Sequence, residues 1–144
     1  MSEYLFVYGT LLPGAAPAAM TALLHRLRRV GPAIVPGYLH DLGNYPGIRI
    51  DPDANAIVRG ELMAVTSAAS WLRLDTYEGY DRAQPERSLF RRERTRVTRT
   101  DTGGEGDAWI YVYNRKLGDA PLIPSGCWLT HLRDKNPDLE AVPV

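Results

Sequence analysis

The sequence predicts a small α+β domain that contains a mixed set of strands and two helices. Apolar runs or period-two alternation predict strands over residues 4–9, 33–39, 56–65, 89–100 and 108–113. Helical periodicity and capping residues predict helices over residues 17–30 and 66–78. With 144 residues the chain has the length of one domain and can bury a core without disulfide bonds.

Composition argues against several classes of protein. The chain has 17 basic and 17 acidic residues, so no net charge attracts nucleic acid or an anionic membrane. One cysteine allows no intrachain disulfide and suits a reducing compartment. No apolar run approaches the ~20 residues of a membrane helix, and the N-terminus lacks signal-peptide features. We expect a cytoplasmic protein without nucleic-acid or membrane partners; its oligomeric state is left open.

The first predicted strand ends in a loop that is suited to binding an anion. Residues 4–8 are all apolar or aromatic, which is typical of a strand buried on both faces. Gly9 breaks this run, and Pro13 and Gly14 close the turn. Because glycine has no Cβ, the backbone N–H groups around it can approach a carboxylate or a developing oxyanion. An ordinary strand followed by a turn is the alternative.

The next segments combine a helical stripe with a broken strand. Gly31 is placed to end the helix over residues 17–30, and Pro36-Gly37 interrupts the strand over residues 33–39, which indicates an edge strand or a bulge. The helix is predicted from the i, i+3, i+4, i+7 and i+10 spacing of Met20, Leu23, Leu24, Leu27 and Val30.

The later strands carry arginines on one segment and tyrosines on the other. The arginines are Arg91, Arg92, Arg94, Arg96 and Arg99. A nucleic-acid-binding stripe would explain them, but Glu93, the neutral overall charge and the few interleaved aromatics favour a solvated strand. Tyr111 and Tyr113 point to the same face, where they either line a pocket or pack in the core.

Tyr8-Gly9-Thr10-Leu11 resembles the signature of the gamma-glutamylcyclotransferase-like family, and the gamma-glutamylamine cyclotransferase branch is the nearest match. Four further segments resemble the family in the same order: Leu42-Gly43-Asn44-Tyr45-Pro46-Gly47, Val58-Arg59-Gly60-Glu61-Leu62, Leu74-Asp75-Thr76-Tyr77-Glu78-Gly79-Tyr80 and Ala108-Trp109-Ile110-Tyr111-Val112-Tyr113. Two departures stand out. Phe90-Arg91 replaces a tyrosine-x-arginine segment, and Cys127 replaces an acid near the C-terminus.

The resemblance implies a curved, barrel-like mixed sheet with flanking helices. It also implies release of 5-oxoproline from a gamma-glutamyl amine or peptide, by attack of the glutamyl α-amine on its own side-chain amide. Glu78 matches the family's general acid/base. The substrate-binding residues implied by the matching segments are Tyr8, Gly9, Thr10, Leu11, Tyr45, Tyr111 and Tyr113. The reaction needs neither a metal nor an organic cofactor.

Burial of Glu78 would suit this reaction. The attacking α-amine has a pKa of about 8, whereas a solvated glutamate near 4.3 is too acidic to take its proton. Apolar surroundings such as Tyr77 and Tyr80 would raise the pKa of Glu78 towards 6–7. Asp75, one turn earlier, either raises that pKa further by like charge or caps the turn, and we favour the cap.

Three questions stay open at this stage. A non-catalytic module that binds a gamma-glutamyl or amino-acid-like ligand is the alternative function. Glu61 is the next candidate base, although a strand glutamate is more often solvated or paired. The amine that leaves the substrate cannot be named. The domain is predicted over residues 1–133, with a loose tail over residues 134–144.

Overall fold

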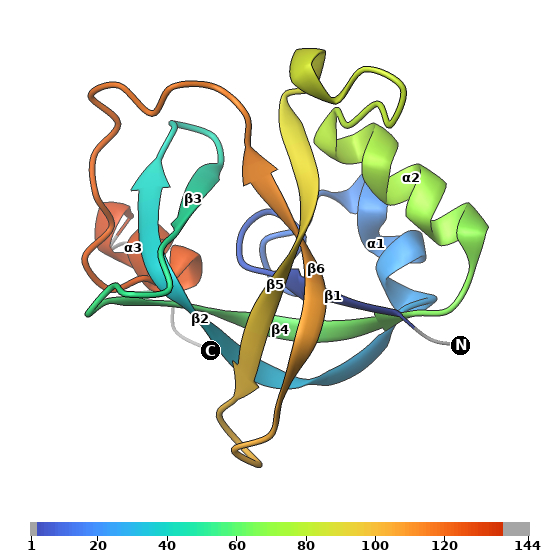
Figure 1. Ribbon diagram of the computed structural model, residues 1–144, viewed down its shortest axis with the longest axis horizontal. Coiled ribbons are helices and arrows are strands. Elements are labelled where there is room, and N and C mark those ends of the chain that lie inside the picture. The colour runs from blue at the N-terminus through green and yellow to red at the C-terminus, as the bar shows by residue number, and fades with distance from the viewer. Residues whose placement is uncertain (1–2, 137–144) are drawn as a thin grey trace.

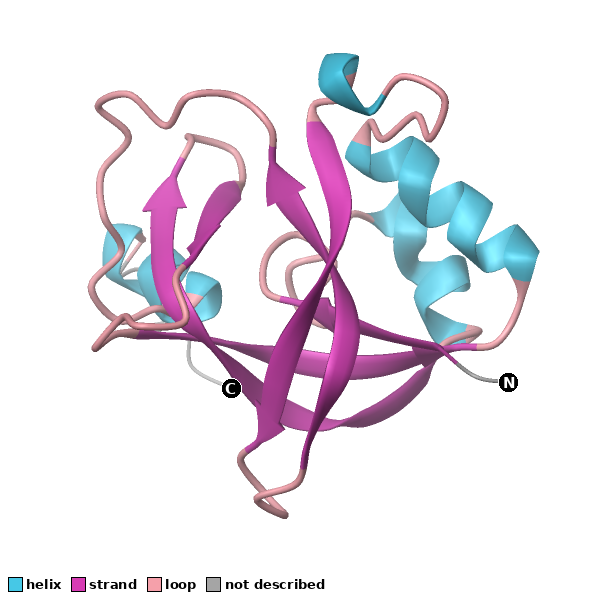
Figure 2. Cartoon of the chain, viewed as in Figure 1, coloured by secondary structure: helices cyan, strands magenta, loops and turns pink. Residues whose placement is uncertain are grey.

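The computed structural model describes residues 3–136. Helices are interspersed among the strands along the chain (Figures 1 and 2). The elements are β1 (Glu3–Val7), α1 (Ala18–His25), β2 (Arg28–Asp41), β3 (Pro46–Ile50), β4 (Ile57–Val65), α2 (Ala68–Glu78), the 3-10 helix Pro85–Arg87, β5 (Phe90–Arg99), β6 (Glu105–Tyr113) and α3 (Trp128–Lys135). Among the described residues, no helix is long and apolar enough to span a bilayer.

Five strands close into a small barrel. The strand order is β3-β2-β4-β1-β6-β5, and β2 also pairs with β5 through Ala33↔Arg99 and Ile34↔Thr98, which closes the circle. β3 extends β2 outside this circle. Helices α1 and α2 lie together on one side, and α3 lies near β3 on the other (Figure 1). The predicted mixed, barrel-like α+β fold is confirmed.

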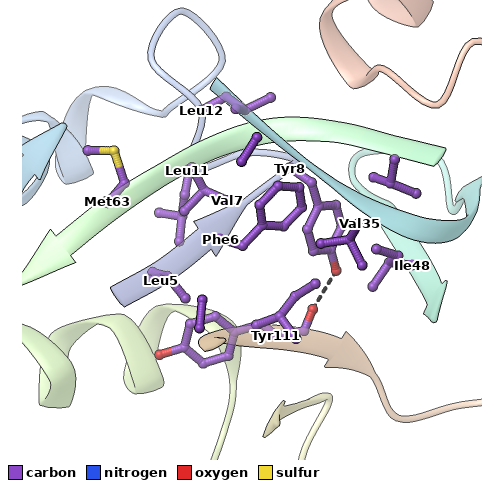
Figure 3. Packing of buried hydrophobic residues seen from close by; sticks show 14 of the residues in the cluster. Leu5, Phe6, Val7, Tyr8, Leu11, Leu12, Val35, Ile48, Met63 and Tyr111 are labelled. Carbon is purple, nitrogen blue, oxygen red and sulfur yellow. Dashed lines mark hydrogen bonds between the residues drawn. The ribbon is translucent and has the colours of Figure 1, made fainter. Parts of the chain in front are cut away.

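β1 runs through the middle of the sheet. It pairs antiparallel with β4 and parallel with β6. Leu5, Phe6 and Val7 are at most 3% exposed, as expected for an apolar strand with neighbours on both sides. The strand ends at Val7, two residues earlier than predicted, but Tyr8 stays buried in the same hydrophobic cluster (Figure 3).

The predicted helix over residues 17–30 was too long. α1 ends at His25, and β2 begins at Arg28, where Arg28 and Arg29 pair with Ala64 and Met63 of β4. Leu27 and Val30 continue the apolar spacing of a helix in the sequence, but both lie beyond the end of α1. The pairing of β2 with β4 outweighs that local pattern. Gly31 therefore follows a bulge in a strand instead of ending a helix.

The edge strand or bulge predicted at residues 36–37 is not found there either. β2 is continuous there, and it changes partner at this point: Pro36 pairs with Ile57 of β4, and Gly37 pairs with Ile50 of β3. Gly37 has a φ of 151°, and a Cβ on it would lie 2.4 Å from the carbonyl oxygen of Arg49. Pro36-Gly37 thus marks the point where β2 changes its partner from β4 to β3. The short strand β3 was not predicted.

The second helix agrees with its prediction, whereas the third was missed. Ser67 caps α2 by accepting the N–H of Ser70 at 3.1 Å, and Gly79 ends the helix with a left-handed φ of 69°. α3 packs through Trp128, which is 2% exposed. The proposed boundary at residue 134 falls inside α3, and the predicted tail beyond residue 136 lies outside the described residues.

Candidate active site

One cavity, of about 210 Å³, gathers most of the predicted site residues. Its walls come from the end of β1, the start of β3, the end of α2, the start of β5 and the middle of β6. The predicted residues that line it are Tyr8, Gly9, Thr10, Leu11, Tyr45, Glu78 and Tyr111. The lining residues not predicted as site residues include Pro46, Tyr77, Leu89 and Phe90.

The loop after β1 lines the cavity with Gly9, Thr10 and Leu11. A turn closed by the Leu12 N–H and the Gly9 carbonyl, 2.9 Å apart, shapes this loop. The Tyr77 hydroxyl donates to Thr10 Oγ1 at 2.9 Å and ties the loop to α2. Within residues 3–136, the N–H groups of Gly9, Thr10 and Leu11 have no hydrogen-bond partner. The loop therefore keeps donors available to a ligand.

Gly9 is required by close packing against the β2–β3 hairpin. A Cβ at Gly9 would lie 2.7 Å from Cγ and 2.9 Å from Cδ of Pro46. Both residues line the cavity. Because a proline ring cannot rotate away, any larger residue at position 9 has to displace the hairpin.

Glu78 is the last residue of α2 and the only acidic residue among those that line the cavity. Burial removes its carboxyl group from water and raises its pKa to about 8. The C-terminal end of a helix also carries partial negative charge, which disfavours an ionised carboxylate there. A pKa near that of an α-amine suits Glu78 to exchange a proton with one.

Two buried tyrosines surround Glu78. The Tyr8 hydroxyl donates to the backbone carbonyl of Tyr111, as the dashed line in Figure 3 shows. Burial, and then the charge of Glu78, raise the pKa of Tyr8 well above its ordinary value. Burial, and then the Asp75 carboxylate, do the same to the pKa of Tyr111. Both phenols therefore stay neutral donors over the physiological pH range.

Asp75 does not have the capping role that we favoured. Its carboxylate accepts the Tyr111 hydroxyl at 2.7 Å and lies 3.6 Å from Arg92 of β5. The residue is 6% exposed, so it is a buried link between α2 and the barrel. No sequence motif predicts this link, since Asp75, Arg92 and Tyr111 are separated by many residues.

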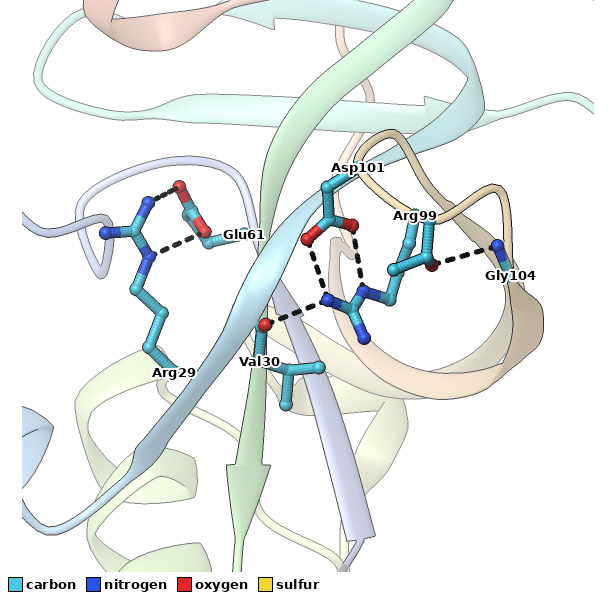
Figure 4. A network of polar contacts seen from close by, with 7 residues as sticks. Arg29, Val30, Glu61, Arg99, Asp101 and Gly104 are labelled. Carbon is cyan, nitrogen blue, oxygen red and sulfur yellow. Dashed lines mark hydrogen bonds and ion pairs between the residues drawn. The ribbon is translucent and has the colours of Figure 1, made fainter.

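Two other candidates lie outside the cavity. Tyr113 does not line it but packs behind it, with ring centroids 5.5 Å from Phe90 and 6.5 Å from Tyr45. Glu61 pairs with Arg29 at 2.6 Å, one of the polar contacts drawn in Figure 4. That ion pair leaves Glu61 on β4 with a structural partner and away from the cavity. No group of three potential metal ligands occurs among the residues that the structure describes.

Sequence comparison places the chain in a known family. Residues 5–130 match the family described as "Gamma-glutamyl cyclotransferase, AIG2-like". The chain is 38% identical over 112 residues to a gamma-L-glutamyl-butirosin B gamma-glutamyl cyclotransferase from Niallia circulans, an alignment that covers 77% of this chain and 67% of that protein.

Solved structures share the fold. YkqA from Bacillus subtilis is 22% identical with a TM-score of 0.71; the match covers 95% of this chain but only 43% of YkqA. An AIG2-like protein from Mus musculus is 21% identical with a TM-score of 0.66, covering 86% of this chain and 87% of the other. With the family match over residues 5–130, the chain belongs to the AIG2-like gamma-glutamyl cyclotransferase family.

Proposed function

We propose that this protein releases 5-oxoproline from a gamma-glutamyl amine, with Glu78 as the general acid/base. The observation that carries the proposal is the position of Glu78, a carboxyl group with a pKa of about 8, in the same cavity as the unpartnered N–H groups after β1. Such an arrangement supplies both a proton carrier and donors for developing negative charge.

The reaction requires the transfer of one proton from the attacking α-amine to the departing nitrogen. The Glu78 carboxylate takes a proton from the glutamyl α-amine as its nitrogen forms a bond to the side-chain amide carbon. A five-membered tetrahedral intermediate results, and its oxyanion accepts hydrogen bonds from backbone N–H groups. Protonated Glu78 then gives its proton to the departing nitrogen as the original amide bond breaks. The products are 5-oxoproline and the free amine, and Glu78 returns to its starting state.

The cavity fits a single glutamyl group. Its 210 Å³ falls below the 300–1,000 Å³ typical of pockets for drug-sized ligands. The N–H groups of Gly9, Thr10 and Leu11 are proposed to hold the α-carboxylate or the oxyanion of the substrate. Tyr45 and Tyr77 supply aromatic walls, so the bound substrate is bent and shielded from water.

The lining favours leaving amines that have no carboxylate next to the amide nitrogen. Among the described residues that form the cavity wall, none is Lys, Arg or His. A carboxylate close to the scissile amide would therefore be desolvated without a counter-ion and would face Glu78. We propose that neutral or cationic alkyl amines are better leaving groups than α-amino acids.

The first test measures 5-oxoproline release by wild type and Glu78→Gln. Glutamine keeps the shape of the side chain but cannot accept the amine proton, so kcat should fall by about 10²–10⁴-fold. Binding of gamma-glutamyl-ethylamide should survive, because the glutamyl group is held by other residues. Near-normal kcat in the variant would move the acid/base elsewhere.

A matched pair of substrates tests the leaving-group preference. Gamma-glutamyl-alaninamide and gamma-glutamyl-alanine differ only in the carboxylate, and we expect kcat/KM to be at least about tenfold higher for the amide. Equal values would contradict that preference. A wild type that binds such compounds and releases no 5-oxoproline from any of them would indicate a binding module.

A further inference from the structure

A buried ion pair lies directly behind the cavity. Arg92 Nη1 of β5 lies 3.6 Å from Asp75 Oδ1 of α2, and the two side chains are only 11% and 8% exposed. The Arg92 guanidinium carbon also lies 4.4 Å from the ring centre of Trp71 and 5.1 Å from that of Trp109. Aromatic rings thus shield the pair from water and strengthen its charge–charge interaction.

This pair is connected to the cavity in two ways. Asp75 Oδ1 accepts the hydroxyl of Tyr111, a lining residue, at 2.7 Å. Asp75 also precedes Glu78 by three residues on α2, and residues with this spacing are neighbours on a helix surface. A negative charge at Asp75 would therefore disfavour ionisation of Glu78. Burial raises the pKa of Glu78.

We propose that Arg92 and Asp75 are a positioning pair for Glu78. Their contact with Tyr111 fixes the last turn of α2 on the barrel, and the Arg92 cation cancels the charge of Asp75 at Glu78. The inference rests on the proposed role of Glu78.

The other groups around Glu78 do not supply this compensation. Those that share its cavity are phenols: Tyr8 after β1, Tyr45 between β2 and β3, Tyr77 on α2 and Tyr111 on β6. Of these, Tyr8 and Tyr111 have pKa values raised by burial, so neither phenol supplies a charge near pH 7. The charged groups behind them are Asp75 and Arg92, one of each sign. The ionisation of Glu78 should therefore respond to each of these two charges in opposite directions.

Direct titration of Glu78 tests the pair. The carboxyl carbon of Glu78 can be followed by ¹³C NMR, with its signal assigned by its absence in Glu78→Gln. Arg92→Gln should raise the midpoint by about one pH unit, because Asp75 is left uncompensated. Asp75→Asn should lower it, because the cation is then unopposed. The double variant should return close to wild type, and Arg92→Lys, which keeps the charge, should shift it much less than Arg92→Gln.

The control is Arg94→Gln. Arg94 also lies over Trp109, at 5.0 Å, but it is exposed and its variant should leave the midpoint unchanged. An unmoved midpoint in Arg92→Gln, or a double variant that does not return towards wild type, would overturn the proposal. If Arg92→Gln fails to fold, Asp75→Asn decides, since a midpoint that does not fall contradicts compensation.

The titration is independent of turnover. A protein that releases no 5-oxoproline overturns the proposed function, whereas the midpoints still decide whether the pair controls Glu78. In an active enzyme, the acidic limb of kcat/KM against pH should move with the NMR midpoint in every variant. A residue that only stabilises the fold would change Tm without this sign-dependent movement.

Discussion

Gly9 packs closely against Pro46 in the wall of the cavity. The Cβ of an alanine there would meet the Pro46 ring at 2.7 Å, and neither residue can turn aside. We expect Gly9→Ala to push the β2–β3 hairpin outward and to raise KM for a gamma-glutamyl amine by at least about tenfold. Steady-state kinetics on the folded variant checks this.

Gly106→Ala provides the matched control for that substitution. A Cβ at Gly106 meets nothing within 4 Å, and the residue lies in β6 away from the cavity. Its KM should equal that of wild type. If Gly9→Ala folds and also keeps its KM, the loop after β1 is a turn without a binding role.

At this scale the sequence predicted well wherever a residue's neighbours are adjacent in the chain. Glu78 and the loop at Gly9, which line the same cavity, were proposed as site residues because each lies in a contiguous motif. Tyr113 was grouped with Tyr111 because alternate residues share a strand face. It lies two residues, roughly 7 Å, farther along β6, and its ring packs against Phe90 instead of lining the cavity. The Asp75–Arg92 contact joins separate elements and left no local pattern to read.

Among the elements, α3 is joined to β2 by the carboxylate of Asp41. Asp41, the last residue of β2, accepts hydrogen bonds from His131 at 2.7 Å and from Lys135 at 3.0 Å. Burial acts to raise the pKa of Asp41, but these bonds and one from the Gly43 N–H outweigh it and lower the pKa to about 2. The stabilisation is therefore present above the unfolded pKa of about 3.8 and is lost as pH falls towards 2.

Asp41→Asn should destabilise the protein by about 1–3 kcal/mol at pH 7. The difference from wild type should shrink as pH falls from about 4 to about 2, as measured by urea unfolding at several pH values. Asp53 is an exposed acid in the turn after β3, and Asp53→Asn should leave the free energy of unfolding almost unchanged. A constant difference at all pH values would assign the effect to shape instead of charge.

The two elements that were not predicted, β3 and α3, are short and are stabilised mainly by contacts with other parts of the fold. β3 has five residues and pairs only through β2, and α3 has eight residues anchored through Trp128 and Asp41. Neither element is long enough to show a clear hydrophobic periodicity in the sequence. The end of α1 was misplaced because Arg28 and Arg29 pair with β4. Ser67 and Gly79 placed α2 correctly because caps are local signals.

For the whole molecule, the raised pKa of Glu78 makes the free energy of unfolding depend on pH. Its pKa rises from 4.5 to about 8 on folding, so the native state holds a proton that the unfolded state releases between these values. Stability contributed by this group is complete below pH 4.5 and is lost as pH rises towards 8. At pH 8, Glu78→Gln should be more stable than wild type by about 2–4 kcal/mol.

Unfolding free energies of wild type and Glu78→Gln from pH 4.5 to pH 8 test this gradient. The two curves should converge at the acid end and separate as the pH rises. Glu86→Gln changes an exposed acid and should run parallel to wild type. Parallel curves for Glu78→Gln would show that Glu78 titrates normally.

Closure of the barrel could not be predicted from periodicity. It depends on the pairing of Ala33 and Ile34 with Arg99 and Thr98, which lie more than sixty positions apart. Periodicity predicts strands but not their partners. Family resemblance supplied the barrel, and the pairings show how it closes.

The hydrogen bond from Tyr8 to the Tyr111 carbonyl spans 103 positions of the chain, and this span governs when the protein acquires its chemistry. A ribosome releases β1 and α2 well before β6. Tyr111 of β6 lines the same cavity as Glu78, so the burial that raises the pKa of Glu78 is complete only when this strand has joined the barrel. Under the proposed function, the acid/base role of Glu78 depends on the complete barrel, and cyclisation should begin only once the barrel has formed.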